Sequence, residues 1–280
     1  MPPETHLDLS IGVVCYHTPE IQLKRLLESI LLSVNHLTQQ QPAFASNLFI
    51  VDNSEHSTVS LELFNHYKKT LGEFNVRLKL TQGHGNIGYG RAHNIPLSEL
   101  SSDYHLVLNP DVVISETALH NALKALRTDH KIKLLSPKAT DKYGRDLFLC
   151  KRYPSVLTLA LRAFLPRPLE VLFARRLANY EMRDLSESKS PVGVPLISGC
   201  FMLAETASLK LIGGFDENYF LYFEDFDLSI RMGKLGEVVY APDVQIIHDG
   251  GNAAGKGGWH IRKFTESGLK FFKTHGWRWT

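Results

Sequence analysis

The first half of this chain repeats one pattern, in which a short apolar run rich in β-branched residues precedes a segment with helical spacing. Such runs predict buried strands, and their alternation with helices predicts a mostly parallel sheet with helices on both faces. The expected strands are residues 9–16, 48–51, 75–81, 105–108 and 132–136. The expected helices are residues 19–35 with Thr18 as their cap, residues 59–71, residues 92–100 and a segment that begins at Ser115. The predicted fold class is therefore α/β.

Polar residues lie at the carboxyl ends of three of the expected strands. They are Tyr16 and His17, Asp52 and Asn53, and Asn109 with Asp111. Ligands of open α/β sheets bind beyond the carboxyl ends of the strands, so these three segments predict a binding site at that edge. A carboxylate at Asp52 could accept a hydrogen bond from the imide N–H of uracil or thymine, and a strand-end Asx turn explains it equally well.

A glycine-rich segment, residues 83–90, precedes the short helix expected at residues 92–100. Glycines allow backbone N–H groups to approach an anion at the start of a helix, where phosphates are often held. The spacing matches the dinucleotide-binding fingerprint, but the segment follows a third strand and lacks the ribose-binding carboxylate expected further on. A tight turn explains this segment, taken alone, slightly better than a phosphate loop.

Two oxygen-bearing side chains, Asn109 and Asp111, stand two residues apart at the end of a strand. Mg²⁺ prefers such ligands and shares its remaining positions with substrate phosphates, although an Asn-Pro-Asp turn is common for this composition. His248 ends a later apolar run and precedes a glycine-rich segment. A single histidine at a strand end is more often structural, but this position suits a metal or diphosphate contact.

Residues 213–228 place five acidic side chains among aromatic and apolar ones: Asp216, Glu217, Glu224, Asp225 and Asp227. Charge in apolar surroundings is costly unless it is paired, bound to a metal or catalytic. Compensation of a helix dipole explains one carboxylate at the start of a helix, but not all five. We therefore expect one of them to act as a general base, because partial desolvation raises the basicity of a carboxylate.

The second half of the chain departs from the alternating pattern. Its expected elements are a hairpin or loop at residues 143–153, a helical segment at 155–184, a polar loop at 186–194, strands at 196–203, 238–240 and 244–247, and helices at 205–211, 224–235 and 259–279.

The overall composition limits the classes of function. The formal net charge is +2, and the three cysteines, Cys15, Cys150 and Cys200, are far apart. We therefore expect neither general nucleic-acid binding nor a disulfide or cysteine–metal framework. The first residues lack the basic and apolar regions of a secretion signal, and no stretch approaches the roughly 18 apolar residues of a spanning helix. The expected location is cytoplasmic, with contact at a membrane surface left open.

The ordered set of motifs resembles the family 2 glycosyltransferases, especially the bacterial rhamnosyltransferase-like branch. The resemblance covers most of the chain, and the long acidic motif is its most specific single part. The matching segments are residues 11–16, 50–54, 86–94, 108–111, 198–200, 213–228 and 242–243, together with His248. His17 and His93 depart from the pattern of the family, and both departures concern the detail of donor binding.

The resemblance implies a GT-A fold, inversion at the anomeric carbon of the sugar and a divalent cation, Mg²⁺ or Mn²⁺. It implies that Asp225 deprotonates the acceptor hydroxyl, that Asp111 is the metal carboxylate, and that His248 contacts the metal or the diphosphate. It also implies that Asp52 contacts the nucleobase. The other residues expected at the nucleotide-sugar site are Tyr16, Asn53, Asn86, Gly88, Arg91, Asn94 and Asn109, and those expected beside the acceptor are Glu224 and Gly199.

One domain, residues 1–280, is expected, with a nucleotide-sugar-binding half at 1–140 and an acceptor-binding, catalytic half at 141–280. The donor that the resemblance favours is dTDP-rhamnose, with a UDP-sugar as the other donor considered. The expected acceptor is a glycan or lipid-linked glycan in the synthesis of a cell-surface polysaccharide such as O-antigen.

Residues 151–184, which include the helical insertion expected at about 155–184, carry seven basic and three acidic residues among apolar ones, and the tail at residues 270–279 adds further basic and aromatic residues. Basic, aromatic, amphipathic segments of this kind suit an anionic membrane surface, although core-facing helices with solvated basic faces explain them better.

Two other functions share part of this pattern, those of a sugar nucleotidyltransferase and of a non-catalytic module that binds a nucleotide or glycan. A sugar nucleotidyltransferase should carry a glycine-rich, basic signature near residues 12–19, which this sequence lacks. A non-catalytic binding module would have no need of Asp111, Asp225 and His248 together.

Overall fold

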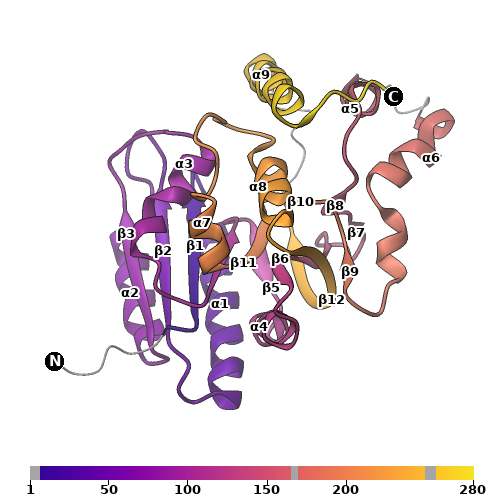
Figure 1. Cartoon of the computed structure of the whole chain (residues 1–280). Coiled ribbons are helices and arrows are strands. Elements are labelled where there is room, and N and C mark those ends of the chain that lie inside the picture. Colours follow the sequence, from indigo (N-terminus) through magenta and orange to yellow (C-terminus); the bar gives the residue numbers. More distant parts are fainter. Residues whose placement is uncertain (1–6, 165–169, 250–256) are drawn as a thin grey trace.

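One large mixed sheet joins strands from both halves of the chain (Figure 1). The structure is a computed structural model that describes residues 7–164, 170–249 and 257–280. The strand order is β3-β2-β1-β4-β11-β6-β12-β5. The first four strands in this order are parallel to one another, as predicted: β1 (Leu9–Cys15), β2 (Ser46–Asp52), β3 (Val76–Thr81) and β4 (Tyr104–Leu108).

Strand β11 (Phe201–Glu205) changes the direction of the sheet, because it pairs antiparallel with both β4 and β6 (Ile132–Thr140). β6 pairs parallel with β12 (Glu237–His248), and β5 (Val112–Ile114) pairs antiparallel with β12. The expected mostly parallel sheet is therefore parallel in its first half and mixed in its second. Short strands also pair as follows: β7 (Asp146–Leu147) with β6, β9 (Val192–Gly193) with β12, and β8 (Cys150–Lys151) with β10 (Leu196–Ile197).

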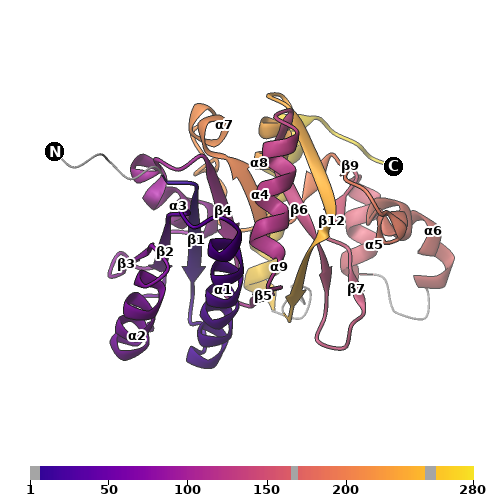
Figure 2. The same ribbon diagram turned by 90° about the horizontal axis from the view of Figure 1, so that it is seen from below.

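Helices cover both faces of the sheet, and Figure 2 is seen from the side that carries α1, α2 and α4. The helices on that face are α1 (Glu20–Gln40), α2 (Leu61–Gly72) and α4 (Ala118–Thr128). The helices on the other face are α3 (Tyr89–Asn94), which continues as a 3₁₀ helix (Ile95–Glu99), α7 (Thr206–Leu211) and α8 (Glu224–Gly233). The α/β fold class predicted from the sequence is confirmed.

Alternating side chains of the central strands fill two cores, one on each face of the sheet. In β4, Leu106 and Leu108 pack with α1 and α4, whereas Val107 packs with the core on the side of α8. In β11, Leu203 packs in the core on the side of α1 and α4, and Met202 packs in the core on the side of α8. Because helices cover both faces, these strands are apolar at successive positions, Leu106 to Leu108 in β4 and Phe201 to Ala204 in β11. This double burial is why the strands can be located as continuous apolar runs.

A further group of helices lies past the β12 side of the sheet. In both views α5 (Val156–Phe164) and α6 (Glu170–Tyr180) lie on this side (Figures 1 and 2), and a 3₁₀ helix (Arg183–Glu187) follows α6. α9 (Gly258–His275) packs aromatic side chains against the segment that precedes α8. Among the helices of the described residues, none combines the length and the apolarity needed to cross a bilayer.

The helix expected at residues 19–35 differs from the prediction at both ends. It continues to Gln40, and Thr18 does not cap it. The Thr18 hydroxyl instead accepts a hydrogen bond from the Tyr16 N–H (3.2 Å), and Pro19 occupies the capping position without a side-chain hydrogen bond. The cap prediction was wrong because Thr18 stabilises the turn after β1 rather than the helix.

Two strand predictions were also wrong in detail. The strand expected at residues 196–203 is two strands, because β10 pairs with β8 in a separate two-stranded sheet whereas β11 belongs to the large sheet. Between them the Gly199 N–H donates a hydrogen bond to the Asp225 carboxylate (3.0 Å). The two strands expected between residues 238 and 247 are one strand, β12, whose pairing with β6 is irregular at its centre. The three-residue strand β5 was not predicted, because it is too short to show a pattern.

Two long helices expected in the second half of the chain differ from the prediction, because one is divided into shorter helices and the other ends earlier. The segment expected at residues 155–184 contains α5, α6 and a 3₁₀ helix, with residues 165–169 outside the described part of the chain. The helix expected at 259–279 ends at His275, because Gly276 adopts a φ of 108°, which helical residues cannot.

Candidate active site

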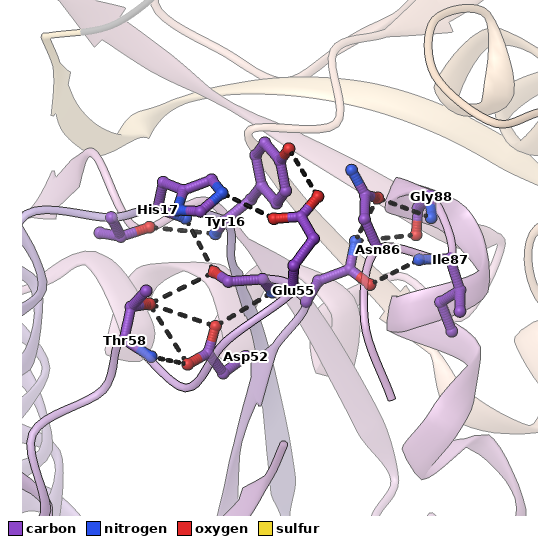
Figure 3. A network of polar contacts seen from close by, with 11 residues as sticks. Tyr16, His17, Asp52, Glu55, Thr58, Asn86, Ile87 and Gly88 are labelled. Atoms are coloured by element: carbon purple, nitrogen blue, oxygen red, sulfur yellow. Dashed lines mark hydrogen bonds and ion pairs between the residues drawn. The ribbon is translucent and has the colours of Figure 1, made fainter. Parts of the chain in front are cut away.

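The carboxyl ends of β1 and β2 and the glycine-rich loop before α3 lie together at one edge of the sheet, where polar side chains form a hydrogen-bonded network (Figure 3). This is the edge at which the polar strand ends predicted a binding site. The residues of the network that the sequence had marked as candidates are Tyr16, Asp52, Asn53, Asn86 and Gly88.

Asp52 organises the loop that follows β2. The residue is 0% exposed. Its carboxylate accepts hydrogen bonds from the backbone of three residues of its own loop: Ser54 (3.1 Å), Thr58 (2.5 Å) and Val59 (3.1 Å). Burial acts to raise the pKa of Asp52, but these hydrogen bonds outweigh it and hold the pKa below its usual value. The arrangement is the strand-end turn considered from the sequence, and contact between Asp52 and a nucleobase stays a prediction.

Asn53 and Asn86 hold the glycine-rich loop against the end of β2. The Asn53 side chain accepts a hydrogen bond from the Ile87 N–H (3.0 Å) and donates one to Asn86 Oδ1 (3.2 Å). Asn86 Oδ1 also accepts a hydrogen bond from the Gly88 N–H (3.1 Å). The N–H groups of Ile87 and Gly88 therefore have partners inside the protein, and the loop adopts a tight turn.

Gly88 allows this loop to touch the acidic segment of the second half. Its φ is 95°, and a Cβ atom at this position would lie 2.6 Å from the carbonyl oxygen of Phe220. The next residue, Tyr89, donates a backbone hydrogen bond to the same carbonyl (3.0 Å). Glycine fits because both the backbone conformation and the available space exclude a side chain.

Arg91 and Asn94 also attach α3 to the acidic segment, residues 213–228. Arg91 Nε donates a hydrogen bond to the carbonyl oxygen of Glu217 (2.6 Å). The Asn94 amide both donates to the Phe215 carbonyl and accepts from the Phe215 N–H, each at 2.9 Å. These contacts position the acidic segment, and the expected contact of both residues with the donor stays a prediction.

Tyr89 connects the two halves of the site. Its hydroxyl lies 2.9 Å from Asn109 Oδ1 and 2.7 Å from the carbonyl oxygen of Gly199, whose N–H in turn binds Asp225 Oδ2 (3.0 Å). Burial raises the pKa of Tyr89 well above its usual value, and the carboxylates at the start of α8 and that of Asp111 raise it further. One buried phenol therefore lies within electrostatic reach of both ends of the predicted site.

The sequence pattern does not mark Tyr89 as a site residue. Its only signal was an aromatic residue at the first position of a helix that begins after a glycine, and the two partners of its hydroxyl are 20 and 110 residues away in the chain.

Two of the five acidic residues in the segment 213–228 have cationic partners. Asp216 pairs with Lys270 of α9 (2.9 Å). Asp227 is buried between Arg231 of its own helix (2.7 Å) and His275 of α9 (2.8 Å). These pairs fasten α9 to the acidic segment and account for the two carboxylates as structural groups.

Glu224 and Asp225 form a close acidic pair at the start of α8. Glu224 is buried, whereas Asp225 is partly exposed. Burial raises the pKa of Glu224, and the charge of Asp225 raises it further. Burial also raises the pKa of Asp225, opposed by hydrogen bonds from the N–H groups of Gly199 and Phe226 and by the charge of Lys151. A partly exposed carboxylate of raised basicity has the properties of a general base.

The backbone before this acidic pair is unusual. Tyr222 and Phe223 have φ values of 72° and 66°, which side-chain-bearing residues rarely adopt and which cost of order 1–3 kcal/mol each. α9 supports this conformation: Ser267 Oγ donates to the carbonyl oxygen of Leu221 (2.8 Å), and a Cβ at Gly268 would lie 3.3 Å from the Phe223 ring. The strained turn and its support set the direction in which α8 begins.

Asp111 and His248 meet at the other end of the site, after β4 and at the end of β12. Asp111 Oδ2 lies 3.3 Å from His248 Nε2, and both side chains are largely shielded from solvent. Within the described residues, no group of three or more His, Cys, Asp or Glu side chains is arranged to hold a metal ion. The glycine-rich segment after His248 lies outside the described residues.

Comparison with known proteins extends these observations. A family model described as "Glycosyltransferase like family 2" matches residues 6–280 of this chain. The N-acetylglucosaminyl-diphospho-decaprenol L-rhamnosyltransferase of Mycobacterium tuberculosis is 27% identical over 260 residues, which cover 87% of this chain and 77% of the relative. The rhamnosyltransferase WbbL of Escherichia coli is 24% identical over 246 residues, which cover 84% of this chain and 81% of the relative.

The fold has counterparts among solved structures. The crystal structure of GalNAc-T7 with UDP, GalNAc and Mn²⁺ matches 88% of this chain and 44% of that protein, with a TM-score of 0.58 at 14% identity. At that identity the likeness concerns the fold alone, and this chain spans less than half of the length of GalNAc-T7. The GT-A fold implied by the sequence motifs is confirmed, and with the family model covering residues 6–280, the chain belongs to glycosyltransferase family 2.

Proposed function

We propose that this protein is an inverting glycosyltransferase that moves L-rhamnose from dTDP-rhamnose to a hydroxyl of a lipid-linked glycan during the synthesis of a cell-surface polysaccharide. Both relatives are rhamnosyltransferases by name, and the name of the mycobacterial relative includes a diphospholipid-linked acceptor. The observation that carries the proposal is the connection from Asn109 through Tyr89 and Gly199 to Asp225, which joins the loop after β4 to the start of α8. A UDP-sugar is the second candidate donor, because UDP is bound in GalNAc-T7.

Asp225 is the proposed base. Its Oδ2 is oriented by the Gly199 N–H and its Oδ1 by the Phe226 N–H (2.9 Å). In the reaction the acceptor hydroxyl gives its proton to the Asp225 carboxylate while its oxygen bonds to the anomeric carbon. The bond to the nucleoside diphosphate breaks on the opposite face, and the electron pair leaves with the diphosphate. Inversion of this kind needs one base and no covalent intermediate.

A divalent cation fits beside Asp111 and His248. A carboxylate oxygen and an imidazole nitrogen 3.3 Å apart can serve the same ion. Two protein ligands are few, but Mg²⁺ and similar cations commonly take further ligands from substrate phosphates and water. When bound, Mg²⁺ or Mn²⁺ would stabilise the negative charge of the leaving nucleoside diphosphate.

The proposal is tested by incubating the purified protein with Mn²⁺, a lipid-linked N-acetylglucosamine diphosphate and either dTDP-rhamnose or UDP-N-acetylglucosamine. Transfer from dTDP-rhamnose with an inverted anomeric centre, assigned by NMR, is the expected result. A retained configuration would contradict the mechanism. Binding of the donor without any turnover would indicate the non-catalytic module, and exchange of pyrophosphate with a nucleoside triphosphate would indicate a nucleotidyltransferase.

Lys151 is expected to set the pH range in which Asp225 acts. It is buried, which lowers its own pKa to about 8, and its charge lowers the pKa of Asp225. Lys151→Met removes the charge at similar volume, so the pKa of Asp225 rises and the acid limb of kcat moves to higher pH. The other titratable groups that interact with Asp225 are Glu224, Tyr89, Tyr180 and Cys200.

A pH profile of kcat measures this shift. Lys142→Met is the matched control, because Lys142 is an exposed lysine outside the site, and it should leave the acid limb in place. An acid limb that does not move in Lys151→Met would show that Lys151 has no electrostatic effect on the base.

We also propose a peripheral contact with the cytoplasmic face of an anionic membrane, made by α6 and the segment after α9. Val171 and Leu172 are 79% and 74% exposed, and Trp279 is 65% exposed. Exposed arginines, Arg175 and Arg278, lie in the same two segments. The tail is fixed to α5, since the Val156 and Leu157 N–H groups donate to its carbonyl oxygens (2.8 and 3.1 Å). Apolar side chains beside cationic ones match the chemistry of an anionic lipid surface.

Flotation with liposomes that contain phosphatidylglycerol is expected to carry the protein to the lipid fraction. The double substitution Val171→Glu and Leu172→Glu should weaken this binding at least tenfold, because it removes apolar contacts and adds repulsion. Leu211→Glu is the control, since Leu211 is equally exposed (75%) but belongs to α7. Equal flotation of all three proteins would contradict this location of the contact.

A further inference from the structure

Tyr180, the last residue of α6, lies beside the start of α8. Its side chain belongs to the same buried aromatic cluster as Phe223, and Phe226 packs against that cluster, so aromatic contacts flank the Glu224–Asp225 pair on both sides. Tyr180 is 4% exposed, and its hydroxyl has no hydrogen-bond partner within the described residues. Burial raises the pKa of Tyr180 to about 12, so the hydroxyl keeps its proton at neutral pH. A buried donor without a partner is costly, and this donor is available to a ligand.

Three cationic side chains gather around Tyr180. Lys151 Nζ and the guanidinium carbon of Arg162 each lie 6.0 Å from the centroid of its ring. The third, Arg183, joins them through Glu181, whose carboxylate lies 2.7 Å from Arg183 and 3.6 Å from Arg162. One carboxylate therefore faces three cations in this group, which we name the Lys151–Arg162–Arg183 cluster. The excess of positive charge favours the binding of an anion.

Lys151 is the innermost cation of the cluster and the one next to the base. It is 7% exposed, its ammonium group donates to the carbonyl oxygen of Phe148, and in the described part of the chain it makes no ion pair with a carboxylate. A buried cation without an anionic partner is costly, so an anion that binds nearby would be attracted to it. Strand β8, which carries Lys151, pairs with β10, and β10 leads to Gly199, whose N–H binds Asp225. The cluster therefore lies on the α6 side of the proposed base.

We propose that Arg162 and Arg183 bind the diphosphate of a lipid-linked acceptor, with the Tyr180 hydroxyl as a further donor and Lys151 as the charge behind them. This inference rests on the proposed function and adds the residues that recognise the acceptor. The side chains of Arg162 and Arg183 are 49% and 47% exposed, so a phosphate can reach them from solvent, and guanidinium groups match pairs of phosphate oxygens. Because Arg162 lies over the Tyr180 ring, its movement toward the phosphate opens the way to the hydroxyl.

The test compares two acceptors in transfer assays with the full chain: N-acetylglucosamine diphosphate on a short, water-soluble prenyl chain, and a neutral alkyl N-acetylglucosaminide. The wild-type KM should be at least tenfold lower for the diphosphate. Arg162→Gln combined with Arg183→Gln should raise that KM at least tenfold, because two charge-assisted contacts are lost, and should leave kcat and the KM of the neutral acceptor unchanged. Arg25→Gln combined with Arg145→Gln is the matched control, since both arginines are exposed and lie outside the cluster, and it should behave as the wild type.

Tyr180→Phe separates binding from folding. The hydroxyl has no partner in the free protein, so its removal should not lower the melting temperature, whereas the KM of the diphosphate acceptor should rise about fivefold. The KM of the neutral acceptor should not change. A lower melting temperature together with equal changes for both acceptors would show that the hydroxyl has a structural role, and the inference would be wrong.

A phosphate on these arginines could also come from a lipid headgroup, and flotation with phosphatidylglycerol liposomes distinguishes the two sources. The double arginine variant should float as the wild type does. Loss of flotation with an unchanged KM for the diphosphate acceptor would assign the arginines to the membrane and overturn the inference. Equal wild-type KM values for the two acceptors would also overturn it and leave glycosyl transfer intact, whereas no transfer to either acceptor would overturn the proposed function as well.

Discussion

Asp225→Asn is expected to lower kcat by roughly 10²- to 10⁴-fold while the affinity for the donor stays nearly unchanged. The amide has the shape of the carboxylate but cannot take the proton of the acceptor hydroxyl. Donor affinity is spared because none of the contacts that hold the glycine-rich loop, from Asn53 to Gly88, involves Asp225. Initial rates with saturating acceptor, together with calorimetric titration of the donor, measure the two quantities separately.

Glu224→Gln is the informative companion to this variant. Glu224 precedes Asp225 in the sequence, but its side chain is almost entirely shielded from solvent, whereas that of Asp225 is partly exposed. We expect a smaller loss of kcat, because a buried carboxylate cannot reach an acceptor. Wild-type turnover in Asp225→Asn combined with an inactive Glu224→Gln would move the role of base to Glu224.

Gly88→Ala is expected to have the second large effect, a loss of about 3 kcal/mol in the free energy of unfolding. A Cβ atom would lie 2.6 Å from the Phe220 carbonyl oxygen, which is also the acceptor for the Tyr89 N–H. Relief of this clash requires the loop and the acidic segment to separate, so the donor affinity and kcat should fall together. Urea denaturation followed by circular dichroism gives the free energy of unfolding, and steady-state kinetics gives kcat and the apparent affinity for the donor.

Gly83→Ala provides a control within the same loop. Gly83 has a φ of 90°, close to that of Gly88, but nothing lies within 4 Å of the position of its Cβ. This variant carries the backbone cost alone, about 1–2 kcal/mol, and should keep its activity. If the two alanine variants lost equal stability and equal activity, the contact with Phe220 would contribute nothing.

The regular part of the fold is predictable from the sequence because its signals are local. Strands such as β4, buried on both faces, appear as short apolar runs, and the positions of Asp52, Asn53 and Asn109 at strand ends follow from the direction of a parallel sheet. For the same reason the edge that carries the network could be predicted without coordinates.

The connections within the site depend on contacts between distant segments, and local patterns do not contain them. Nothing near Tyr89 in the chain indicates that its hydroxyl meets Asn109 and Gly199. The burial of Asp52 and the exposure of Glu55, three residues later, also depend on how two loops fold against each other. Residue type and position predict a functional carboxylate after β2, but only the packed structure shows that Asp52 points inward and Glu55 outward.

The interruption between β10 and β11 has a consequence for how this enzyme tolerates genetic change. The Gly199 N–H orients Asp225 Oδ2, but a Cβ atom at Gly199 would lie 3.3 Å from the Tyr89 hydroxyl and 3.4 Å from Asp225 Cβ. A side chain at this position would therefore press on the residues that the backbone aligns, and proline would also remove the N–H itself. We expect evolution to keep this position small, because the hydrogen bond comes from the main chain but the space around it admits little beyond a hydrogen atom.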